Sequence, residues 1–330
     1  MKPIRWGILS TGKIAASLAE TLKKHKGAEL LAVGSRQKKS AEQFGRQFDI
    51  PRRYANYQDL VNDPDVDVVY VATPHNLHHQ NTLIALEAGK HVLCEKSFAL
   101  NAAQSREMIA AARRKKLFLM EAMWMRFIPA TIKLLELLKK GTIGEVRALR
   151  AEFGIDPGVG PEHRLLNPSL AGGSLLDVGV YPVTLAHLVF GRPQSVATRA
   201  HIGLTGVDEQ AGMVFGYPGG RIASLLTAVT TAMTQTAFIY GTKGYIQIHP
   251  FFWHSKRLTV YRKNRPPQAV PAPYSGTGYQ FEVEEVMRSI RAGKLQSDLW
   301  PLSETLAVME TMDTIRAQWG LRYPSETGAA

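Results

Sequence analysis

Short apolar runs alternate with amphipathic stretches through the first third of the chain. The apolar runs, each bounded by turn residues, predict β-strands at residues 4–9, 30–33, 66–72, 92–94 and 117–120. The stretches between them repeat apolar residues at helical spacing and predict helices at residues 14–24, 40–48, 57–61, 80–88 and 102–115. This strand–helix alternation predicts a Rossmann-type, doubly wound parallel sheet with right-handed crossovers.

The pattern changes after Gly144, where alternating apolar and polar residues dominate. Strands are expected at residues 146–153, 195–203, 211–215, 222–226, 236–240, 245–248 and 258–261. Helices are expected at residues 131–140, 183–190, 281–291 and 303–318. The chain is therefore expected to be α/β, with an N-terminal Rossmann domain over residues 1–122. A C-terminal α+β domain with a large, mostly antiparallel open sheet is expected over residues 123–330.

Composition limits the class of protein. With 45% hydrophobic and 21% charged residues, the chain has the composition of a globular protein with a full core. We find no signal sequence at Met1 and no run of about 18 apolar residues, so no membrane partner is expected. The single cysteine, Cys94, favours a reducing compartment, and a cytoplasmic location is expected. The net charge is +12, but the basic residues are scattered without a nucleic-acid motif, which makes nucleic acid an unlikely partner.

A charged pair follows the short apolar run at residues 92–94. Glu95 and Lys96 come directly after it, where ligands bind in parallel α/β sheets. Lys96 is therefore a candidate catalytic residue, although a solvated pair that opens a loop is the alternative. The histidines His75, His78 and His79 follow the preceding strand. No carboxylate or cysteine completes a metal-binding set with them, so no metal is expected.

A dinucleotide site is expected at the turn after the first strand. Ser10, Gly12 and Ala15 occupy the three glycine positions of the G-x-G-x-x-G/A fingerprint, whose turn and helix N-terminus hold a pyrophosphate. After the second strand, Ser35 and Arg36 stand where NAD-binding chains carry an acid, and Lys39 lies close by. A hydroxyl and a guanidinium suit a 2′-phosphate, so NADP(H) is expected in preference to NAD(H). The alternative is a polar helix cap.

At the level of the whole chain, the sequence resembles the glucose–fructose oxidoreductase / inositol dehydrogenase / rhizopine-catabolism (Gfo/Idh/MocA) family of two-domain, nicotinamide-dependent oxidoreductases. The resemblance rests on the glycine turn, Thr73-Pro74 with His78, Glu95-Lys96, Gly172-Gly173 with Asp177 and Tyr181, residues 241–244, and the ending Met312-Asp313, Arg316, Gly320 and Tyr323-Pro324. Within the family, the sequence most resembles the branch of dimeric dihydrodiol dehydrogenases and NADP-dependent aldose (D-xylose) dehydrogenases, and three features carry this resemblance. They are Ser10, the run from Glu121 to Phe127, and a tyrosine at position 181.

The resemblance implies a catalytic set of Lys96, Asp177 and Tyr181. Tyr181 would exchange a proton with the reacting oxygen, and Lys96 beside it would lower the pKa of the phenol from about 10. Asp177 would accept a hydrogen bond from a substrate hydroxyl. The alternatives are a structural, buried Tyr181 and an Asp177 that caps a helix.

The resemblance also implies binding residues. The expected cofactor-binding residues are Ser10, Thr11, Gly12, Lys13, Ile14, Ser35, Arg36, Lys39, Thr73, Pro74, His75, His78, Glu95, Lys96, Trp124 and Arg126. The expected substrate-binding residues are Lys96, Trp124, Phe153, Asp177, Tyr181 and Trp253. Two positions depart from the family pattern: Ser97 replaces the usual proline after Lys96, and His75-Asn76 stands where many relatives carry asparagine first.

The expected function is an NADP(H)-dependent oxidoreductase that transfers a hydride between the nicotinamide and a sugar, polyol or cyclic vicinal diol. A ketosugar reductase of the anhydrofructose type is one alternative. Another is a dinucleotide-binding regulatory protein without turnover, as some family members are, but the full set of Lys96, Asp177 and Tyr181 argues against it. A homo-oligomer, and in particular a dimer, is expected from the family.

Overall fold

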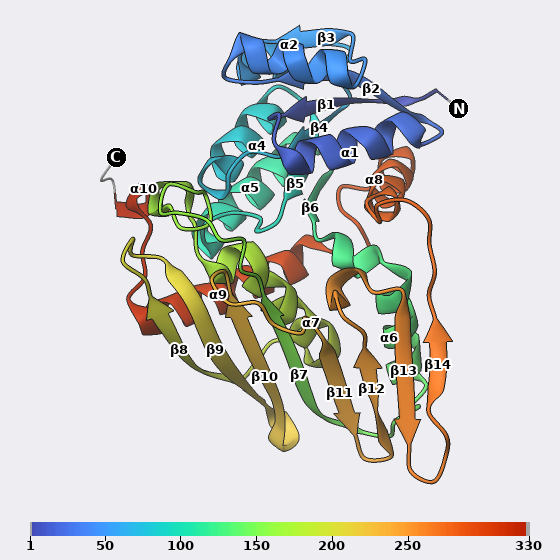
Figure 1. Cartoon of the computed structure of the whole chain (residues 1–330). Helices are drawn as coiled ribbons and strands as arrows, with labels where there is room; N and C mark the ends of the chain where they lie inside the picture. Colours follow the sequence, from blue (N-terminus) through green and yellow to red (C-terminus); the bar gives the residue numbers. More distant parts are fainter. Residues whose placement is uncertain (1, 328–330) are drawn as a thin grey trace. The chain divides into compact units, whose positions relative to one another are not determined.

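The computed structural model describes residues 2–327 and divides them into two compact units (Figure 1). The first unit comprises the chain up to Trp124 together with Ser275–Leu306. The second comprises Met125–Tyr274 and the chain from Ala307 onward. Each unit is described below by itself.

The first unit is built on a sheet of six parallel strands in the order β3-β2-β1-β4-β5-β6. This is the order of doubly wound dinucleotide-binding sheets, so the predicted Rossmann fold is confirmed. The strands are β1 (Ile4–Leu9), β2 (Ala28–Gly34), β3 (Arg52–Tyr54), β4 (Val68–Val71), β5 (His91–Glu95) and β6 (Leu119–Ala122). The connecting helices are α1 (Lys13–Lys24), α2 (Lys38–Gln47), α3 (Tyr57–Val61), η1 (His75–Leu77), α4 (His78–Glu87) and α5 (Ala102–Lys115).

The strand bounds differ from the prediction by up to two residues, and two of the differences have a clear physical reason. β3 was not predicted, because its residues Arg-Arg-Tyr carry no apolar run; it is an edge strand that pairs only with β2. β6 begins two residues later than predicted and includes Glu121, which pairs in register with Cys94 of β5. A glutamate normally ends an apolar strand, but Glu121 is buried and has hydrogen-bond donors inside the protein.

The second unit is built on an eight-stranded sheet in the order β14-β13-β12-β11-β7-β10-β9-β8, with β14 and β8 at its edges (Figure 1). Its strands are β7 (Val146–Gly154), β8 (Ser195–Ile202), β9 (Asp208–Tyr217), β10 (Arg221–Ala228), β11 (Ala237–Gly241), β12 (Gly244–Ile248), β13 (Arg257–Arg262) and β14 (Gln268–Pro271). Only β7 and β10 pair in parallel, so the predicted large, mostly antiparallel sheet is confirmed.

Helices cover one face of this second sheet. They include α6 (Pro129–Lys139) and α7 (Val180–Phe190), which is preceded by the π-helical stretch η4 (Leu175–Gly179). Several shorter helices lie in the connections between these elements or near the carboxyl terminus. They are η2 (Trp124–Phe127), η3 (Pro168–Leu170), η5 (Pro218–Gly220), η6 (Phe252–His254) and α10 (Pro324–Thr327). Residues on the covered face, such as Leu149, Leu225 and Ile239, are almost fully buried, as the core of a two-layer unit requires.

Residues 275–306 return to the first unit after the strands of the second. They include α8 (Gln280–Arg291) and the start of α9 (Leu302–Trp319). The hydroxyls of Thr21 on α1 and Thr277 lie 2.9 Å apart, and α8 packs against α1. The first unit is therefore discontinuous in sequence, and the roles expected for residues 1–122 and 123–330 stay predictions.

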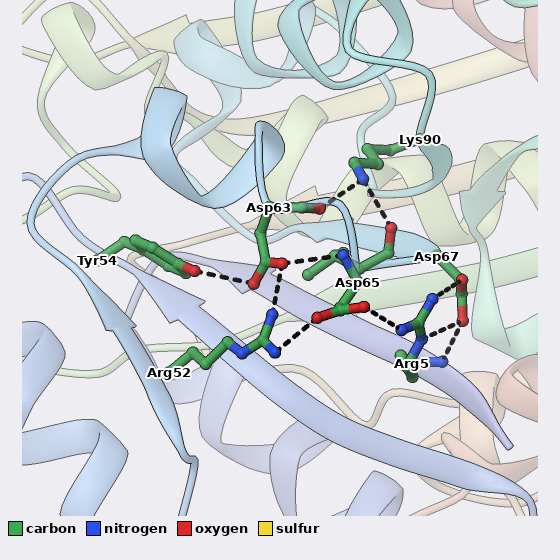
Figure 2. A network of polar contacts seen from close by, with 8 residues as sticks. Arg5, Arg52, Tyr54, Asp63, Asp65, Asp67 and Lys90 are labelled. Carbon is green, nitrogen blue, oxygen red and sulfur yellow. Dashed lines mark hydrogen bonds and ion pairs between the residues drawn. The ribbon is translucent and has the colours of Figure 1, made fainter.

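An ion-pair network lies at the amino-terminal ends of the strands of the first sheet (Figure 2). Arg5 binds Asp67 and Asp65, and Arg52 binds Asp65 and the buried Asp63, at 2.6–3.1 Å. The Arg52 and then the Arg5 guanidinium lower the pKa of Asp65. β1 runs from this edge to the glycine turn at its other end, so the network stabilises the sheet away from the expected cofactor site.

One segment, Pro168–Phe190, is long and apolar enough to be compared with a membrane span. Within the fold, 83% of its most apolar window is buried, as in the core helix of a soluble protein. The segment therefore gives no indication of a membrane, and the expected cytoplasmic location stays a prediction.

Candidate active site

The turn after β1 has the geometry of a phosphate-binding loop. Ser10 adopts a positive φ of 112°, a conformation that usually requires glycine and explains how the turn forms without the first glycine of the fingerprint. The Ser10 hydroxyl accepts a hydrogen bond from Gly12 N at 3.4 Å, and Gly12 is the N-cap of α1. The first turn of α1 contains no acidic residue, which suits an anion at its positive end. Thr11, Lys13 and Ile14 lie at this turn and helix start.

A second polar group follows β2. Ser35 is buried, its N–H donates to the Tyr54 carbonyl at 3.1 Å, and its hydroxyl accepts from Gln37 N at 3.4 Å. Arg36 and Lys39 are exposed. Burial raises the pKa of the Tyr57 phenol, and the nearby Arg36 guanidinium opposes that shift. The residues after β2 thus include two exposed cations and one buried hydroxyl.

His78 joins the loop after β4 to the turn after β5. Its Nδ1 lies 2.8 Å from the Ser97 carbonyl oxygen and its Nε2 lies 2.8 Å from that of Thr73. Burial lowers the pKa of the ring to about 4, against the effect of these carbonyls. The neutral ring has one N–H and can donate to one of these carbonyls at a time, and its position between them places His78 between Thr73 and the Lys96–Ser97 turn. Pro74 and the buried His75 lie in the same loop.

The turn after β5 carries Lys96. The buried Glu95 carboxylate accepts hydrogen bonds from Tyr70 OH and, at 3.1 Å, from Lys96 N. Burial, together with the Glu95 charge, raises the pKa of Tyr70 well above 10, so the phenol remains a donor. The peptide bond between Lys96 and Ser97 is cis. Lys96 is partly exposed at the carboxyl end of a parallel strand, as expected.

Trp124 lies just beyond β6 and stacks on Tyr279, with ring centroids 4.5 Å apart. Tyr279 precedes α8, and no sequence motif drew attention to it. Trp124 of this ring pair is buried, and Tyr279 is partly exposed. Arg126, which is also expected to bind cofactor, lies in η2 and belongs to the second unit.

Asp177 and Tyr181 lie one helical turn apart in the second unit. Asp177 is inside η4 and not at a helix N-cap, which excludes the capping alternative. Its carboxylate accepts a hydrogen bond from Arg164 Nη1 at 2.7 Å. The side chain of Arg164 is 55% exposed, whereas that of Asp177 is 8% exposed, so Arg164 covers a nearly buried carboxylate. The sequence analysis missed Arg164, which lies in a loop without periodicity.

Two aromatic rings, which are stacked on each other, lie against Tyr181. Phe153 of β7 stacks on Trp253 of η6, with ring centroids 3.6 Å apart. The Tyr181 ring lies 5.5 Å from Phe153 and 5.8 Å from Trp253. Phe252, which was not predicted, packs edge-on against both. The structure therefore brings together the second-unit residues Phe153, Tyr181 and Trp253, which were chosen from distant parts of the sequence.

The buried thiol of Cys94 takes no part in this chemistry. It lies in β5 with no exposed surface, and burial raises its pKa. A thiol in this state is a poor nucleophile. Within residues 2–327, no group of three or more histidine, cysteine or acidic residues could hold a metal ion.

Family models match both parts of the chain. The model described as "Oxidoreductase family, NAD-binding Rossmann fold" matches residues 4–123, and the "GFO/IDH/MocA C-terminal domain" model matches residues 131–247. The first of these models and the strand order of the six-stranded sheet define a Rossmann-type oxidoreductase. The chain belongs to the Gfo/Idh/MocA oxidoreductase family.

Relatives cover nearly the whole chain. Trans-1,2-dihydrobenzene-1,2-diol dehydrogenase of Mus musculus is 38% identical over 98% of this chain and 99% of its own length. D-xylose 1-dehydrogenase (NADP(+)) of Hypocrea jecorina is 38% identical over 97% of this chain and 93% of its own length. Among solved structures, a 3-ketoreductase from Actinomadura kijaniata in complex with NADP and TDP-benzene aligns with a TM-score of 0.87. It is 26% identical and covers 96% of this chain and 98% of its own.

Proposed function

We propose that this protein is an NADP(H)-dependent oxidoreductase that acts on a sugar, a polyol or a cyclic vicinal diol. The observation that carries the proposal is the ring cluster of Phe153, Tyr181 and Trp253, with Asp177 one helical turn before Tyr181. A phenol, a carboxylate and two stacked aromatic rings thus lie in one part of the second unit. The names of two curated relatives, a dihydrodiol dehydrogenase and an NADP(+)-dependent xylose dehydrogenase, support the same substrate classes.

The proposed dinucleotide-binding residues are those of the first unit. Backbone N–H groups at Gly12–Ile14 and the N-terminus of α1 would hold the pyrophosphate. Ser35, Arg36 and Lys39 would bind a 2′-phosphate, which is why we propose NADP(H) in preference to NAD(H). Thr73, Pro74, His75 and Glu95 would line the nicotinamide end, with His78 holding their loop.

When bound, the nicotinamide supplies the hydride acceptor or donor. Tyr181 would take the hydroxyl proton during oxidation and return it during reduction, and Lys96 would supply a positive charge to the reaction. Asp177, oriented by Arg164, would accept a hydrogen bond from a second substrate hydroxyl. The rings of Phe153 and Trp253 would exclude water and stack on the C–H face of a sugar or on a planar ring.

The test follows the absorbance of the reduced nicotinamide with NADP⁺ or NAD⁺ and a panel of trans-dihydrodiols, D-xylose, D-glucose and polyols. We expect turnover with NADP⁺ that falls about 10²–10⁴-fold in Tyr181→Phe, because the general acid–base group is lost. Tyr217→Phe is the matched control. It removes the hydroxyl of another buried tyrosine of the second unit, one that has no hydrogen-bond partner among the described residues, so turnover should persist.

The panel is also run in reverse, with NADPH and the matching ketones and lactones. Reduction of ketosugars without oxidation of the alcohols would favour the reductase alternative. Tight dinucleotide binding without turnover in either direction would contradict the proposal and favour a regulatory protein.

We also propose that the protein forms a homo-oligomer through the uncovered face of its second sheet. Val214, Ile222 and Leu226 lie on that face and are 43–48% exposed. Beside them runs a band of contacting rings on β11, β12 and β13, formed by Phe238, Tyr240, Tyr245 and Tyr261. A two-fold axis would pack this face of one copy against the same face of a second copy. Both apolar faces would then be buried, and no further apolar face would be exposed.

A further inference from the structure

A buried carboxylate holds the start of the helix that carries Asp177 and Tyr181. Asp208, the first residue of β9, has no exposed surface. Its Oδ2 accepts hydrogen bonds from Ser174 Oγ at 2.8 Å and from Leu175 N at 2.7 Å. Amides in the first turn of a helix have no partner within the helix, and an anion beside them is favoured by the helix dipole. Asp208 of strand β9 therefore caps the N-terminus of this helix.

The turn before the helix is closed around the same carboxylate. Gly173 has a φ of +114°, and a Cβ at this position would lie 2.2 Å from Asp208 Oδ1. Gly173 N donates to the Leu165 carbonyl at 2.8 Å, and Thr227 Oγ1 donates to the Ser174 carbonyl at 3.3 Å. The Ser174 hydroxyl is thus bound by Asp208 of β9, and the Ser174 carbonyl is bound by Thr227 of β10. The preceding Gly173 is bound by the loop residue Leu165.

Helical structure runs without a break from Ser174 through η4 and α7 to Phe190. Asp177 and Tyr181 lie three and seven residues after Ser174, so a shift of the first turn moves both side chains. A helix on a sheet transmits such a shift because its core contacts are close-packed. Residues 175–187 are all buried, which leaves the helix little freedom to adjust locally.

The charge of Asp208 also acts on the carboxyl-terminal motif of the sequence. Tyr323 is fully buried, and its pKa is raised well above 10 by burial and then by the charge of Asp208. The Arg316 guanidinium lies 5.0 Å from the Tyr323 ring and binds Glu326 at 2.7 and 2.9 Å. Arg316, Tyr323 and Glu326 of the carboxyl-terminal segment thus contact one another inside the second unit, and the charge of Asp208 acts on the Tyr323 phenol.

We propose that Asp208 is a positioning residue, which fixes the first turn of this helix and through it the placement of Asp177 and Tyr181. The inference rests on the proposed function, because it takes Asp177 and Tyr181 as the catalytic pair of the second unit. Asp208 has no direct part in the chemistry.

The test compares three variants of the full-length protein with a matched control. Asp208→Ala removes both acceptor bonds, Asp208→Asn keeps an amide oxygen that can accept both, and Ser174→Ala removes only one donor. Asp63→Ala is the control, because Asp63 is an equally buried aspartate in the first unit, at the sheet edge away from the glycine turn (Figure 2). NADPH affinity, kcat, KM, thermal unfolding and amide hydrogen exchange are measured for each.

We expect Asp208→Ala to lower kcat about 10–100-fold, the cost of a misplacement of about 1 Å, while NADPH affinity stays at the wild-type value. Ser174→Ala should lie between Asp208→Ala and the wild type, and Asp208→Asn should retain most of the activity. Amides from Leu175 to Tyr181 should exchange faster in Asp208→Ala and, to a smaller extent, in Ser174→Ala, but not in Asp63→Ala. Asp63→Ala should lower the unfolding temperature but leave kcat unchanged.

Two results would overturn the inference. One is an Asp208→Ala protein that loses thermal stability as Asp63→Ala does but keeps the wild-type kcat. The other is wild-type exchange at residues 175–181 in Asp208→Ala. If the wild-type protein shows no turnover on any substrate, the proposed function fails instead, and the exchange rates alone decide whether Asp208 fixes the turn.

Discussion

At the scale of single residues, the partner of Asp177 is the feature with the clearest consequence. Arg164 binds this carboxylate from a loop, with more than half of its side chain exposed. Exposed ion pairs add little to stability, so the contact matters for the orientation of Asp177.

We predict that Arg164→Ala lowers kcat/KM about 10-fold, the equivalent of one hydrogen bond of about 1.4 kcal/mol to a charged group. The unfolding temperature should change little. Steady-state kinetics and thermal unfolding check this, with Arg147→Ala on β7 as control, because Arg147 is similarly exposed and pairs with Glu145, just before that strand. Equal kinetics for the two variants would rule out a role for Arg164 at Asp177.

A second prediction at this scale concerns the choice between NADP and NAD. Arg36→Ala should weaken NADP⁺ binding about 10–100-fold, because a charge-assisted contact to a phosphate is worth about 1.5–3 kcal/mol. NAD⁺ binding should be nearly unchanged. Fluorescence titration measures both affinities, and Arg46→Ala on α2 is the control, since Arg46 pairs only with Glu42 on its own helix. An equal loss for NADP⁺ and NAD⁺ would contradict a 2′-phosphate site at Arg36.

At the scale of elements, Glu121 joins strand β6 to the returning segment 275–306. Its Oε2 accepts from Trp300 Nε1 at 3.1 Å and from Thr305 Oγ1 at 3.0 Å. Burial outweighs these donors and raises the pKa of Glu121 to about 7. The sequence pattern predicted that this strand ends at residue 120, because a charged residue normally lies outside a buried strand. The donors Trp300 and Thr305 of segment 275–306 allow a glutamate to be buried in the strand.

This pKa predicts a dependence of stability on pH. The folded protein binds a proton at Glu121 that the unfolded chain releases between its ordinary pKa of 4.5 and about 7. The free energy of unfolding therefore falls as the pH rises through that window. Glu121→Gln cannot titrate, so between pH 5 and pH 8 it should gain about 2–3 kcal/mol relative to the wild type. Urea unfolding at both pH values measures this.

The control for this experiment is Glu136→Gln on the exposed side of α6, which should follow the wild type at both pH values. If Glu121→Gln also runs parallel to the wild type across this range, Glu121 is already ionised in the fold and burial does not dominate.

At the scale of the whole molecule, the uncovered face of the second sheet is expected to join two copies. Ile222→Glu would place a charge on that face, and a buried unpaired charge is costly. We predict that the variant has half the wild-type mass or less by light scattering. Leu204→Glu is the control, because Leu204 lies fully exposed between β8 and β9. A monomeric wild type would contradict the proposal.

The sequence by itself determined the fold class, the order of most elements and a chemically sensible set of site residues. These depend on local periodicity, on glycine turns and on motifs such as Ser10-x-Gly12 and Glu95-Lys96, which can be recognised along the chain. Strands β3 and β14 were not predicted, because both are edge strands and an edge strand needs no apolar run. The roles of the site residues stay predictions.

Only the tertiary structure decided which side chains meet. It stacked Phe153 on Trp253, brought Arg164 to Asp177 and Tyr279 to Trp124, and placed Asp208 at the start of the helix that carries Tyr181. It also returned residues 275–306 to the first unit. These contacts join residues far apart in sequence, and neither periodicity nor spacing encodes them, because they arise from the packing of whole elements around a shared core.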